Sequence, residues 1–476
     1  MDNLNIINQS FALLLILILS FTFVIVGIFY SLKNKGLNNY LVANRDINTL
    51  SLTTSFVASA LGAWILFGPS SAATWGGIGA VIGYSLGTAF PLFVLYFLGD
   101  KFRRFFPKGK SLTEVIRIKF GKRLFKLILC LSIFYMLIFL IAEVTAVSML
   151  IKYISGISLW KTSLIVIVSS LVYTLHGGLR ASIFTDNIQF IIIILLLLFS
   201  FNYLNSFNNN EFNFDFVRQN KPFLLSSSYL PNFTAGLTFF IAVAATNLFH
   251  QGNWQRVYAA KNIKILRKSL IFAFLIILPV VFFMGFTGLV AISKNPNLVP
   301  DLAFFSLLLN DQVLIITIIL IILAISLTVS SIDTLINAIS SLIIVDLNKI
   351  IKFKGDYFKL SKFIIVGLSI IAFFISSRGL SILYLFLLAD LLCCSAVLSI
   401  FYGFYNKNLN KSNIYIAILF GLFFGLMLFP SPDFSKSILI GILFPISNFP
   451  AFMSQSLLFM SFLVATFVPI LAWKIK

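Results

Sequence analysis

LSLTTSFVASALGAWILFGPSSAATWGGIGAVIG, residues 50–83, is apolar enough to cross a bilayer, yet residues that interrupt helices occur along it. They are Gly62, Gly68, Pro69, Gly76, Gly77 and Gly79, interspersed with small hydroxyl residues. An interrupted helix is tolerated at membrane depth only where its freed carbonyls and amides line a cavity or bind something. In secondary transporters such helices mark the midplane site for solute and ion. The stretch therefore predicts a broken membrane helix that lines a binding site.

Composition supports a membrane environment for the rest of the chain. Of 476 residues, 59% are hydrophobic and 11% are charged, and the mean hydropathy is +1.02. Soluble domains average about 25% charged residues, so we predict an all-α polytopic membrane protein. Cys130, Cys393 and Cys394 lie in apolar runs, which indicates neither a disulfide framework nor a cysteine metal site. His176 and His250 match no metal-ligand spacing.

Hydrophobic segments of spanning length recur from one end of the chain to the other. Residues 11–31 are too long for a signal-peptide core and are followed by Lys33 and Lys35, which predicts a first spanning helix. The other segments are 50–76, 78–98, 127–151, 158–176, 182–203, 233–254, 269–292, 312–345, 363–377, 380–404, 412–430 and 451–473. Together they predict about thirteen transmembrane helices. A short apolar stretch at 436–447 is predicted as a loop or re-entrant piece.

The distribution of Lys and Arg predicts the orientation. With these spans, 28 of the 35 Lys and Arg fall on one side of the membrane and 7 on the other. Cytoplasmic loops carry the excess of positive residues, so we predict a multi-pass cell-membrane protein with its N-terminus outside and its C-terminus cytoplasmic. The net charge of +20 then reflects topology and contact with anionic lipid, and no nucleic-acid partner is expected.

Four acids fall within or at the edge of predicted spans: Glu143, Asp186, Asp333 and Asp390. Each costs about 2.5–3.5 kcal/mol at a helix centre. No Lys or Arg is expected deep in a helix, because Arg256 is predicted at the cytoplasmic mouth. A cation, a proton or a polar solute is then the natural partner. The alternative is that the acids are protonated or bonded to hydroxyls and amides inside the bundle.

Two segments give these acids a polar context. Residues 324–347, AISLTVSSIDTLINAISSLIIVDL, place Ser330 and Ser331 on a polar stripe of an otherwise apolar helix. Close helix packing with back-bonded hydroxyls would also explain that stripe. Residues 173–189, YTLHGGLRASIFTDNIQ, predict a tight Gly-Gly connection, after which Asp186 enters the next helix near its N-terminal end. An acid at that position could also be a helix cap.

Four blocks of the chain resemble the sodium:solute symporter family, which includes sodium/proline, sodium/glucose and sodium/iodide transporters. They are ASALGAWILFGP at 58–69, YTLHGGLRASIFTDNIQ at 173–189, NWQRVYAAK at 253–261 and SSIDTLINAISSLIIVDL at 330–347. The resemblance implies a LeuT-type fold with two inverted five-helix repeats. The implied segments are a leading helix and loop (1–49), repeats at 50–203 and 233–404, an external loop between them (204–232) and two trailing helices (405–476).

The resemblance also implies the ion sites. The common sodium site would use the carbonyls of Ala58, Leu61 and Leu327 and the hydroxyls of Ser330 and Ser331. Asp186 matches a residue that family members use for a second sodium or for sodium exit, and we group Asp333 with it. Oxygen ligands suit a small hard cation, and an interrupted helix frees carbonyls to provide them. Sodium is then the coupling ion and the only metal, with no cofactor expected.

The solute is expected between the breaks in the first and sixth core helices. The predicted contacts are Ser59, Gly62, Ala63, Trp64, Thr246 and His250, with Glu143 and Asp390 facing the same cavity. If both acids are ionised, they favour a solute with an amine, a guanidinium or a urea-like group. Ala60 and Gly62 stand where proline-type members have an acid and a serine, which weakens an inference to proline. The Ala- and Thr-containing sixth core helix is poorly equipped to stack a sugar ring.

These observations predict sodium-coupled uptake of a small polar organic solute, carried out by alternating access. Proton coupling on the same fold and a non-transporting solute sensor are the alternatives. A membrane enzyme using His250 is disfavoured, because no second catalytic group lies at a recognisable spacing. No Walker loop or dinucleotide fingerprint occurs, which disfavours an ATP-driven pump. The solute and the oligomeric state stay open.

Overall fold

The computed structural model describes residues 4–33, 36–207, 211–351, 353–405, 411–432, 436–437, 439 and 451–471. Within these residues the chain is helical almost throughout, and only two isolated β-bridges occur. In chain order the helices are α1 (Gln9–Lys33), α2 (Leu37–Val42), η1 (Ala43–Arg45), α3 (Thr49–Ala60), η2 (Ala63–Leu66), α4 (Gly68–Phe105), α5 (Leu112–Phe120), α6 (Lys122–Ser155), α7 (Leu159–Phe207), α8 (Phe214–Asn220), η3 (Pro222–Leu225), α9 (Leu230–Phe249), α10 (Gln251–Ala259), α11 (Ile263–Lys294), η4 (Pro300–Leu302), α12 (Ala303–Leu308), α13 (Leu314–Asp346), η5 (Leu347–Lys349), α14 (Tyr357–Ser376), α15 (Ile382–Gly403), α16 (Lys411–Leu428) and α18 (Ala451–Leu471). The predicted all-α class is confirmed.

Ten helices in the described residues are long and apolar enough to cross a membrane. Two of them extend over more than one predicted span: α4, with 38 residues, covers the end of 50–76 and all of 78–98, and α7, with 49 residues, covers two spans almost entirely. At 1.5 Å per residue a straight α7 would extend about 70 Å, more than twice the ~30 Å hydrocarbon core. Non-helical glycines interrupt both, Gly77 in α4 (φ 57°) and Gly178 in α7 (φ 60°). The predicted spans 158–176 and 182–203 are therefore the two arms of α7.

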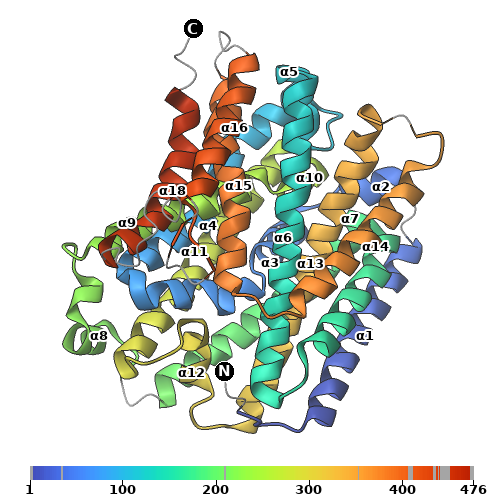
Figure 1. Ribbon diagram of the computed structural model, residues 1–476. Coiled ribbons are helices and arrows are strands. Elements are labelled where there is room, and N and C mark those ends of the chain that lie inside the picture. Colours follow the sequence, from blue (N-terminus) through green and yellow to red (C-terminus); the bar gives the residue numbers. More distant parts are fainter. Residues whose placement is uncertain are drawn as a thin grey trace.

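The remaining predicted spans are also found as helices. The span at 50–76 consists of α3, η2 and the first part of α4, and the last predicted span corresponds to α18. The predicted loop or re-entrant piece at 436–447 lies almost entirely outside the described residues. Figure 1 shows α1 beginning at the lower end of the bundle and α18 ending at the upper end.

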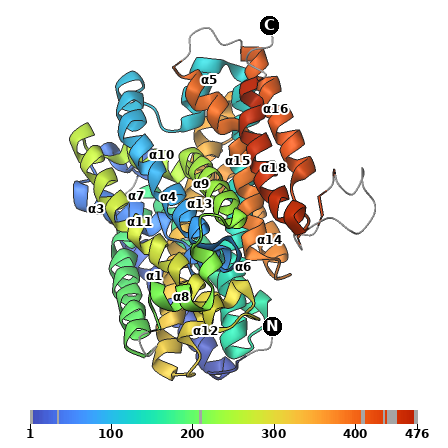
Figure 2. The ribbon, with the colours of Figure 1, turned by 90° about the vertical axis from the view of Figure 1, so that its left-hand side faces the viewer.

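The helices that carry the predicted sites lie at the centre of the bundle. α13 packs against both α6 and α7, and 78% of its most apolar window is buried, compared with 28% for α1. α4 packs along α9 and α11, while α16 and α18 pack on each other and against α15 at one side (Figures 1 and 2). The polar stripe of α13 is therefore enclosed by other helices.

Part of the glycine cluster in residues 50–83 serves helix packing. A Cβ on Gly79 would overlap the Asn232 carbonyl of α9, and one on Gly83 would overlap the Gly236 carbonyl. Small residues let two helix backbones approach closely in a membrane. These glycines of α4 thus form the contact with α9, whereas Gly62 lies at the helix break described below.

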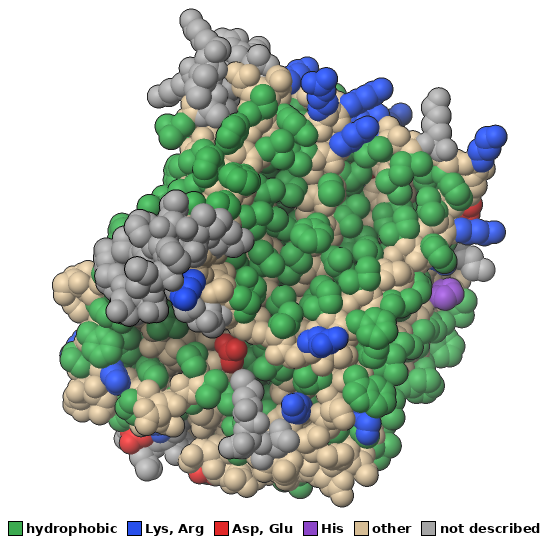
Figure 3. All heavy atoms as spheres, in the orientation of Figure 1, with side chains coloured by type: hydrophobic (Ala, Val, Ile, Leu, Met, Phe, Trp, Pro, Cys, Tyr) green, Lys and Arg blue, Asp and Glu red, His purple; other side chains and the backbone are tan. Residues whose placement is uncertain are grey.

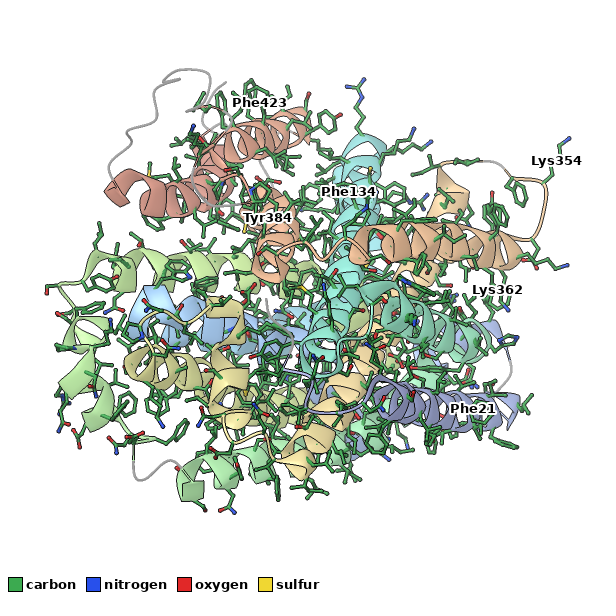
Figure 4. All side chains as sticks on the ribbon, turned by 60° about the horizontal axis from the view of Figure 1, so that its bottom comes forward. Phe21, Phe134, Lys354, Lys362, Tyr384 and Phe423 are labelled. Atoms are coloured by element: carbon green, nitrogen blue, oxygen red, sulfur yellow. The ribbon has the colours of Figure 1, made fainter. Side chains whose placement is uncertain are left out.

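The outer surface is that of an integral membrane protein. The space-filling view shows a broad hydrophobic area across the middle of one face, with Lys and Arg at its upper edge (Figure 3). Phe21 of α1, Phe134 of α6 and Phe423 of α16 are each more than half exposed, and Figure 4 labels them on three separate helices. Exposed aromatic rings on long apolar helices are suited to contact with lipid chains.

Candidate solute and ion site

Two helix breaks lie in the bundle, the first within residues 50–83, where the sequence predicts an interrupted helix, and the second within the predicted span 233–254, in the core helix for which the resemblance implies a break. α3 ends at Ala60, and Leu61 (ψ 86°) and Gly62 (ψ −176°) continue as non-helical backbone before η2 begins at Ala63. In the second break, α9 ends at Phe249, and His250 (φ −60°, ψ 110°) separates it from α10. Each break frees main-chain groups inside the bundle.

Glu143 of α6 occupies the first break. Its Oε2 accepts a hydrogen bond of 2.8 Å from the backbone nitrogen of Ala63, and its side chain is 1% exposed. The position of Gly62 allows this approach, because a Cβ there would overlap both Glu143 Oε1 and the hydroxyl of Ser331 on α13. Three helices therefore meet at one glycine.

Replacing Gly62 by alanine is expected to abolish solute uptake. The added methyl group would push the Glu143 carboxylate and the α13 hydroxyl away from the break, so the carboxylate would lose its backbone partner. Uptake into proteoliposomes would measure the loss. Gly367→Ala on α14 is the matched control, because a Cβ at that glycine meets nothing within 4 Å. Equal uptake by the two variants would contradict the prediction.

A small cavity of about 40 Å³ lies between the two breaks. Its lining consists of Ser59, Ala60, Trp64, Tyr84, Phe139, Glu143, Val243, Thr246, Asn247, His250, Ser331, Leu335, Phe386 and Asp390. Of the eight predicted solute contacts, six line this cavity. The other two, Gly62 and Ala63, lie directly behind it and contact the Glu143 carboxylate.

Asp390 of α15 also lines the cavity. Its Oδ1 accepts a hydrogen bond of 2.6 Å from the hydroxyl of Thr246 on α9. His250 also lines the cavity, and its Nδ1 accepts a bond of 3.1 Å from the backbone nitrogen of Gly252. An accepting Nδ1 carries no proton, so this geometry corresponds to a neutral imidazole. The lining thus contains two carboxyl groups and no Lys or Arg.

Aromatic residues form part of the cavity wall. Trp64 stacks on Tyr84 with ring centroids 5.6 Å apart, and its indole nitrogen donates to the Ala60 carbonyl at 3.1 Å. Phe139 and Phe386 meet edge to face at 4.8 Å. Tyr84, Phe139 and Phe386 are lining residues that the sequence did not identify.

Asp186 and Arg256 form an ion pair in the interior, with Nη2 2.8 Å from Oδ2 and both side chains fully buried. The expectation that no Lys or Arg lies deep in the bundle is therefore wrong. Arg256 does not lie at the mouth, because the short helix α10 follows the His250 break and turns it inward. Nor does Asp186 cap a helix, since it lies in the second arm of α7.

Hydroxyl groups complete this ion pair. Asp186 accepts from Ser55 at 2.6 Å and from Ser330 at 2.7 Å. Arg256 donates to Ser55 at 2.7 Å and to Thr334 at 2.9 Å. The cluster thus joins α3, the second arm of α7, α10 and α13.

Asp333 lies close to this cluster and is bonded to hydroxyls. Its carboxyl oxygens accept from Tyr173 at 2.8 Å, from Ser182 at 3.0 Å and from Thr185 at 3.2 Å. Within the described residues no Lys or Arg makes an ion pair with Asp333. The four membrane acids therefore divide into two sets, Glu143 and Asp390 at the cavity and the other two around Arg256.

The residues implied as sodium ligands lie on α3 and α13 near the first break. Ala58, Leu61, Leu327 and Ser330 are fully buried, and Ser331 is 7% exposed. Ser331 also lines the cavity, so the implied ion site adjoins the cavity. Among the described residues no cluster of three His, Cys, Asp or Glu could hold a metal ion.

The comparisons with known proteins agree on a transporter family and fold. The family model of the sodium:solute symporters matches residues 40–421. A "Spermidine transporter" of Candida albicans is 26% identical over 394 residues, which cover 82% of this chain and 74% of the relative. A "Sodium/glucose cotransporter 4" of Danio rerio is 28% identical over 188 residues, 38% of this chain and 28% of the relative.

Solved structures share the fold at low sequence identity. A Na⁺-coupled sialic acid symporter in a substrate-bound outward-open state superposes with a TM-score of 0.72 at 17% identity, covering 97% of this chain and 98% of that one. Mhp1, a nucleobase-cation-symport-1 family transporter, in a closed conformation, superposes with a TM-score of 0.57 at 12% identity, covering 91% and 93%. These similarities confirm the LeuT-type architecture.

Proposed function

The chain belongs to the sodium:solute symporter family, and we propose that it couples sodium entry to the uptake of a small organic solute carrying cationic nitrogen groups. As a family member it is a solute symporter rather than an enzyme. The proposal concerns the coupling ion, the solute class and the orientation. The excess of Lys and Arg on one side supports a cytoplasmic C-terminus in the cell membrane.

The charge of the cavity carries the solute assignment. Glu143 and Asp390 are both buried there, His250 has the geometry of a neutral imidazole, and the lining has no Lys or Arg. A buried carboxylate without a counter-charge is costly, so a solute ammonium or amidinium would compensate it. The similarity to a relative named as a spermidine transporter supports the same solute class.

The implied sodium ligands remain the proposed coupling site. Ser330 donates its hydroxyl hydrogen to Asp186, which leaves the oxygen lone pairs free to face a cation. Ser331 lies beside the broken end of α3, where carbonyls of Ala58 and Leu61 would complete an oxygen site. Asp186 would act on sodium through Ser330, with Arg256 as its resting counter-charge.

Proton coupling is the second candidate, and Asp333 is the observation that favours it. A buried carboxyl group surrounded by the hydroxyls of Tyr173, Ser182 and Thr185 could accept a proton without leaving its partners. On that alternative Asp333 would carry the coupling charge in place of sodium.

Uptake of spermidine into proteoliposomes tests the coupling. We expect an inward sodium gradient to accelerate uptake severalfold over potassium. Ser330→Ala and Ser331→Ala should each raise the sodium concentration for half-maximal uptake about tenfold, which corresponds to about 1.4 kcal/mol. Ser369→Ala on α14 is the control, because this serine is also buried and lies outside the proposed site. Uptake driven equally in sodium and potassium by a pH gradient would favour proton coupling instead.

A further inference from the structure

A second cavity, of about 680 Å³, opens at the end of the bundle where most Lys and Arg lie. It shares no lining residue with the solute cavity. Three separate parts of the chain form its walls: α2 with η1, the connection from α4 into α5, and the C-terminal end of α13 with η5. We call it the basic pocket, for the charges described next.

The basic pocket has more positive than negative side chains. Its charged lining residues are Arg45, Lys108, Lys110, Lys349 and Glu114. Lys349 is paired both with Glu114 at 3.1 Å and with Asp346 at 3.0 Å, whereas the Arg45 guanidinium donates to main-chain carbonyls, at 2.6 Å and 2.9 Å. The amino groups of Lys108 and Lys110 make no hydrogen bond or ion pair with the described residues. Two ammonium groups therefore remain available at the pocket.

The backbone on one wall of the pocket is strained. Ala43, Asn44 and Arg45 have φ values of 46°, 53° and 59°, and none is a glycine. Ala43 and Arg45 each cost about 1–2 kcal/mol in this region, which asparagine tolerates more readily, and such strain clusters at ligand clamps and switch regions. Asn44 is itself part of the pocket lining.

Close contacts join the three walls. Arg45 holds the carbonyls of Pro107 and Gly109, and Lys349 holds Glu114. The hydroxyls of Ser111 and Thr113 both donate to Asp346 at the end of α13, each at 2.7 Å. α2 and η1 lead directly into α3, the helix that ends at the first break. Alternating access requires elements around a fixed site to rock apart. The gating role inferred below rests on the proposed transport function, in which these walls are among the elements that separate.

We propose that the basic pocket binds a phosphate-bearing anion with at least two negative charges, and that the bound anion holds this end of the transporter closed. An anion contacting Lys108 and Lys110 on one wall and the Arg45 guanidinium, whose hydrogen-bond partners are neutral carbonyls, on another would bridge parts that must separate. A ligand that binds one conformation better shifts the population toward it. A soluble phosphorylated molecule and an anionic lipid headgroup share this chemistry.

Thermal unfolding of the full-length protein in detergent tests the binding, and it does not depend on the transported solute. Potassium pyrophosphate is compared with potassium chloride at equal ionic strength. We expect pyrophosphate to raise the Tm with saturation, because a ligand of the folded state stabilises it. The variant Lys108→Ala/Lys110→Ala should need at least about ten times more pyrophosphate for the same shift, the change in Kd that follows from losing about 1.4 kcal/mol of binding.

The matched control is Lys122→Ala/Lys126→Ala, which removes the same charge from exposed positions of α6 outside the pocket. It should respond to pyrophosphate as the unaltered protein does. If pyrophosphate has no effect, nanodiscs of phosphatidylglycerol should raise the Tm over nanodiscs of phosphatidylcholine, and only while Lys108 and Lys110 are present. That result would identify a lipid headgroup as the source. Absence of both effects, or equal responses of the two double variants, would overturn the site.

The gating part has its own measurement. With pyrophosphate on both sides of a proteoliposome membrane, we expect slower solute uptake by the unaltered protein and little change in the Lys108→Ala/Lys110→Ala variant. Stabilisation by pyrophosphate without any slowing of uptake would overturn the gating role while retaining the site. Loss of uptake in every condition would concern the proposed transport function, and the stability measurement would still decide the binding.

Discussion

Arg256→Gln is expected to lower the free energy of unfolding by about 3–5 kcal/mol, because it leaves the Asp186 carboxylate buried without its counter-charge. Both side chains are fully buried, and the Nη2–Oδ2 distance is 2.8 Å. The guanidinium also donates to Ser55, to Thr334 and to the Gly252 carbonyl. A glutamine would satisfy part of the hydrogen bonding and none of the charge.

Thermal unfolding in detergent measures this loss. Arg256→Gln/Asp186→Asn should recover much of the stability, because the double variant removes both charges and the cycle isolates their coupling. Arg218→Gln is the control, since Arg218 pairs with Asp215 at the surface, where both side chains are more than two-thirds exposed. An exposed pair contributes only about 0–1 kcal/mol. Equal losses from Arg256→Gln and Arg218→Gln would contradict the structural role of the buried pair.

The first helix break could be predicted because its signal is local. Gly62 and the flanking small residues cannot form a continuous packed span, and the structure has its break at Leu61 and Gly62. The hydroxyl-rich sequence of α13 likewise predicts a polar helix inside the bundle, and α13 packs there against α6, α7 and α14. Both predictions need only the residues of a single segment, because those residues determine whether that segment can form a continuous apolar helix.

The position of Arg256 could not be predicted from its own segment. It follows an apolar run and precedes Lys261 and Lys264, a pattern typical of a cytoplasmic helix end. Its burial depends on the His250 break and on an acid 70 residues earlier in the chain. One signal for the burial of Arg256 was charge balance, because acids inside the membrane require partners. A second was that Arg256 lies in a block that resembles a family motif.

The aromatic side of the cavity was missed for a related reason. With 55 Phe and 15 Tyr in the chain, an aromatic residue in a predicted span carries little information. Tyr84, Phe139 and Phe386 reach one cavity only because α4, α6 and α15 converge there. Polar residues such as Glu143 and Asp390 are rare in spans, so their inward direction was predictable.

The surroundings of Asp390 in the cavity can be compared with those of Asp186 in the buried ion pair. Asp186, on the second arm of α7, accepts from Ser55 of α3, and Asp390, on α15, accepts from Thr246 of α9. In each proposed repeat the acid therefore lies on the fifth helix, and the hydroxyl that donates to it lies on the first. Arg256 supplies the cation for the first carboxylate, whereas the cavity lining supplies none for the second. The comparison therefore suggests that the solute's own cationic group takes that place beside Asp390.

Asp390→Asn and Glu143→Gln are each expected to weaken spermidine binding by about 30-fold or more. The physical reason is that removing one partner of a buried charge pair costs about 2 kcal/mol or more. Amide side chains keep the size and most of the hydrogen bonding of the acids, so the loss of affinity measures the effect of removing the negative charge. The measurement is the spermidine concentration needed for half-maximal thermal stabilisation in sodium.

Asp301→Asn separates this effect from a general response to losing a carboxylate. Asp301 accepts a hydrogen bond of 2.9 Å from Ser71, much as Asp390 does from Thr246, but it lies outside the cavity lining. Burial raises the pKa of Asp301, and the Ser71 bond opposes that shift. Because Asp301 does not line the cavity, Asp301→Asn should bind spermidine as the unaltered protein does. Unchanged binding in Asp390→Asn and Glu143→Gln would instead mean that the cavity does not select for positive charge.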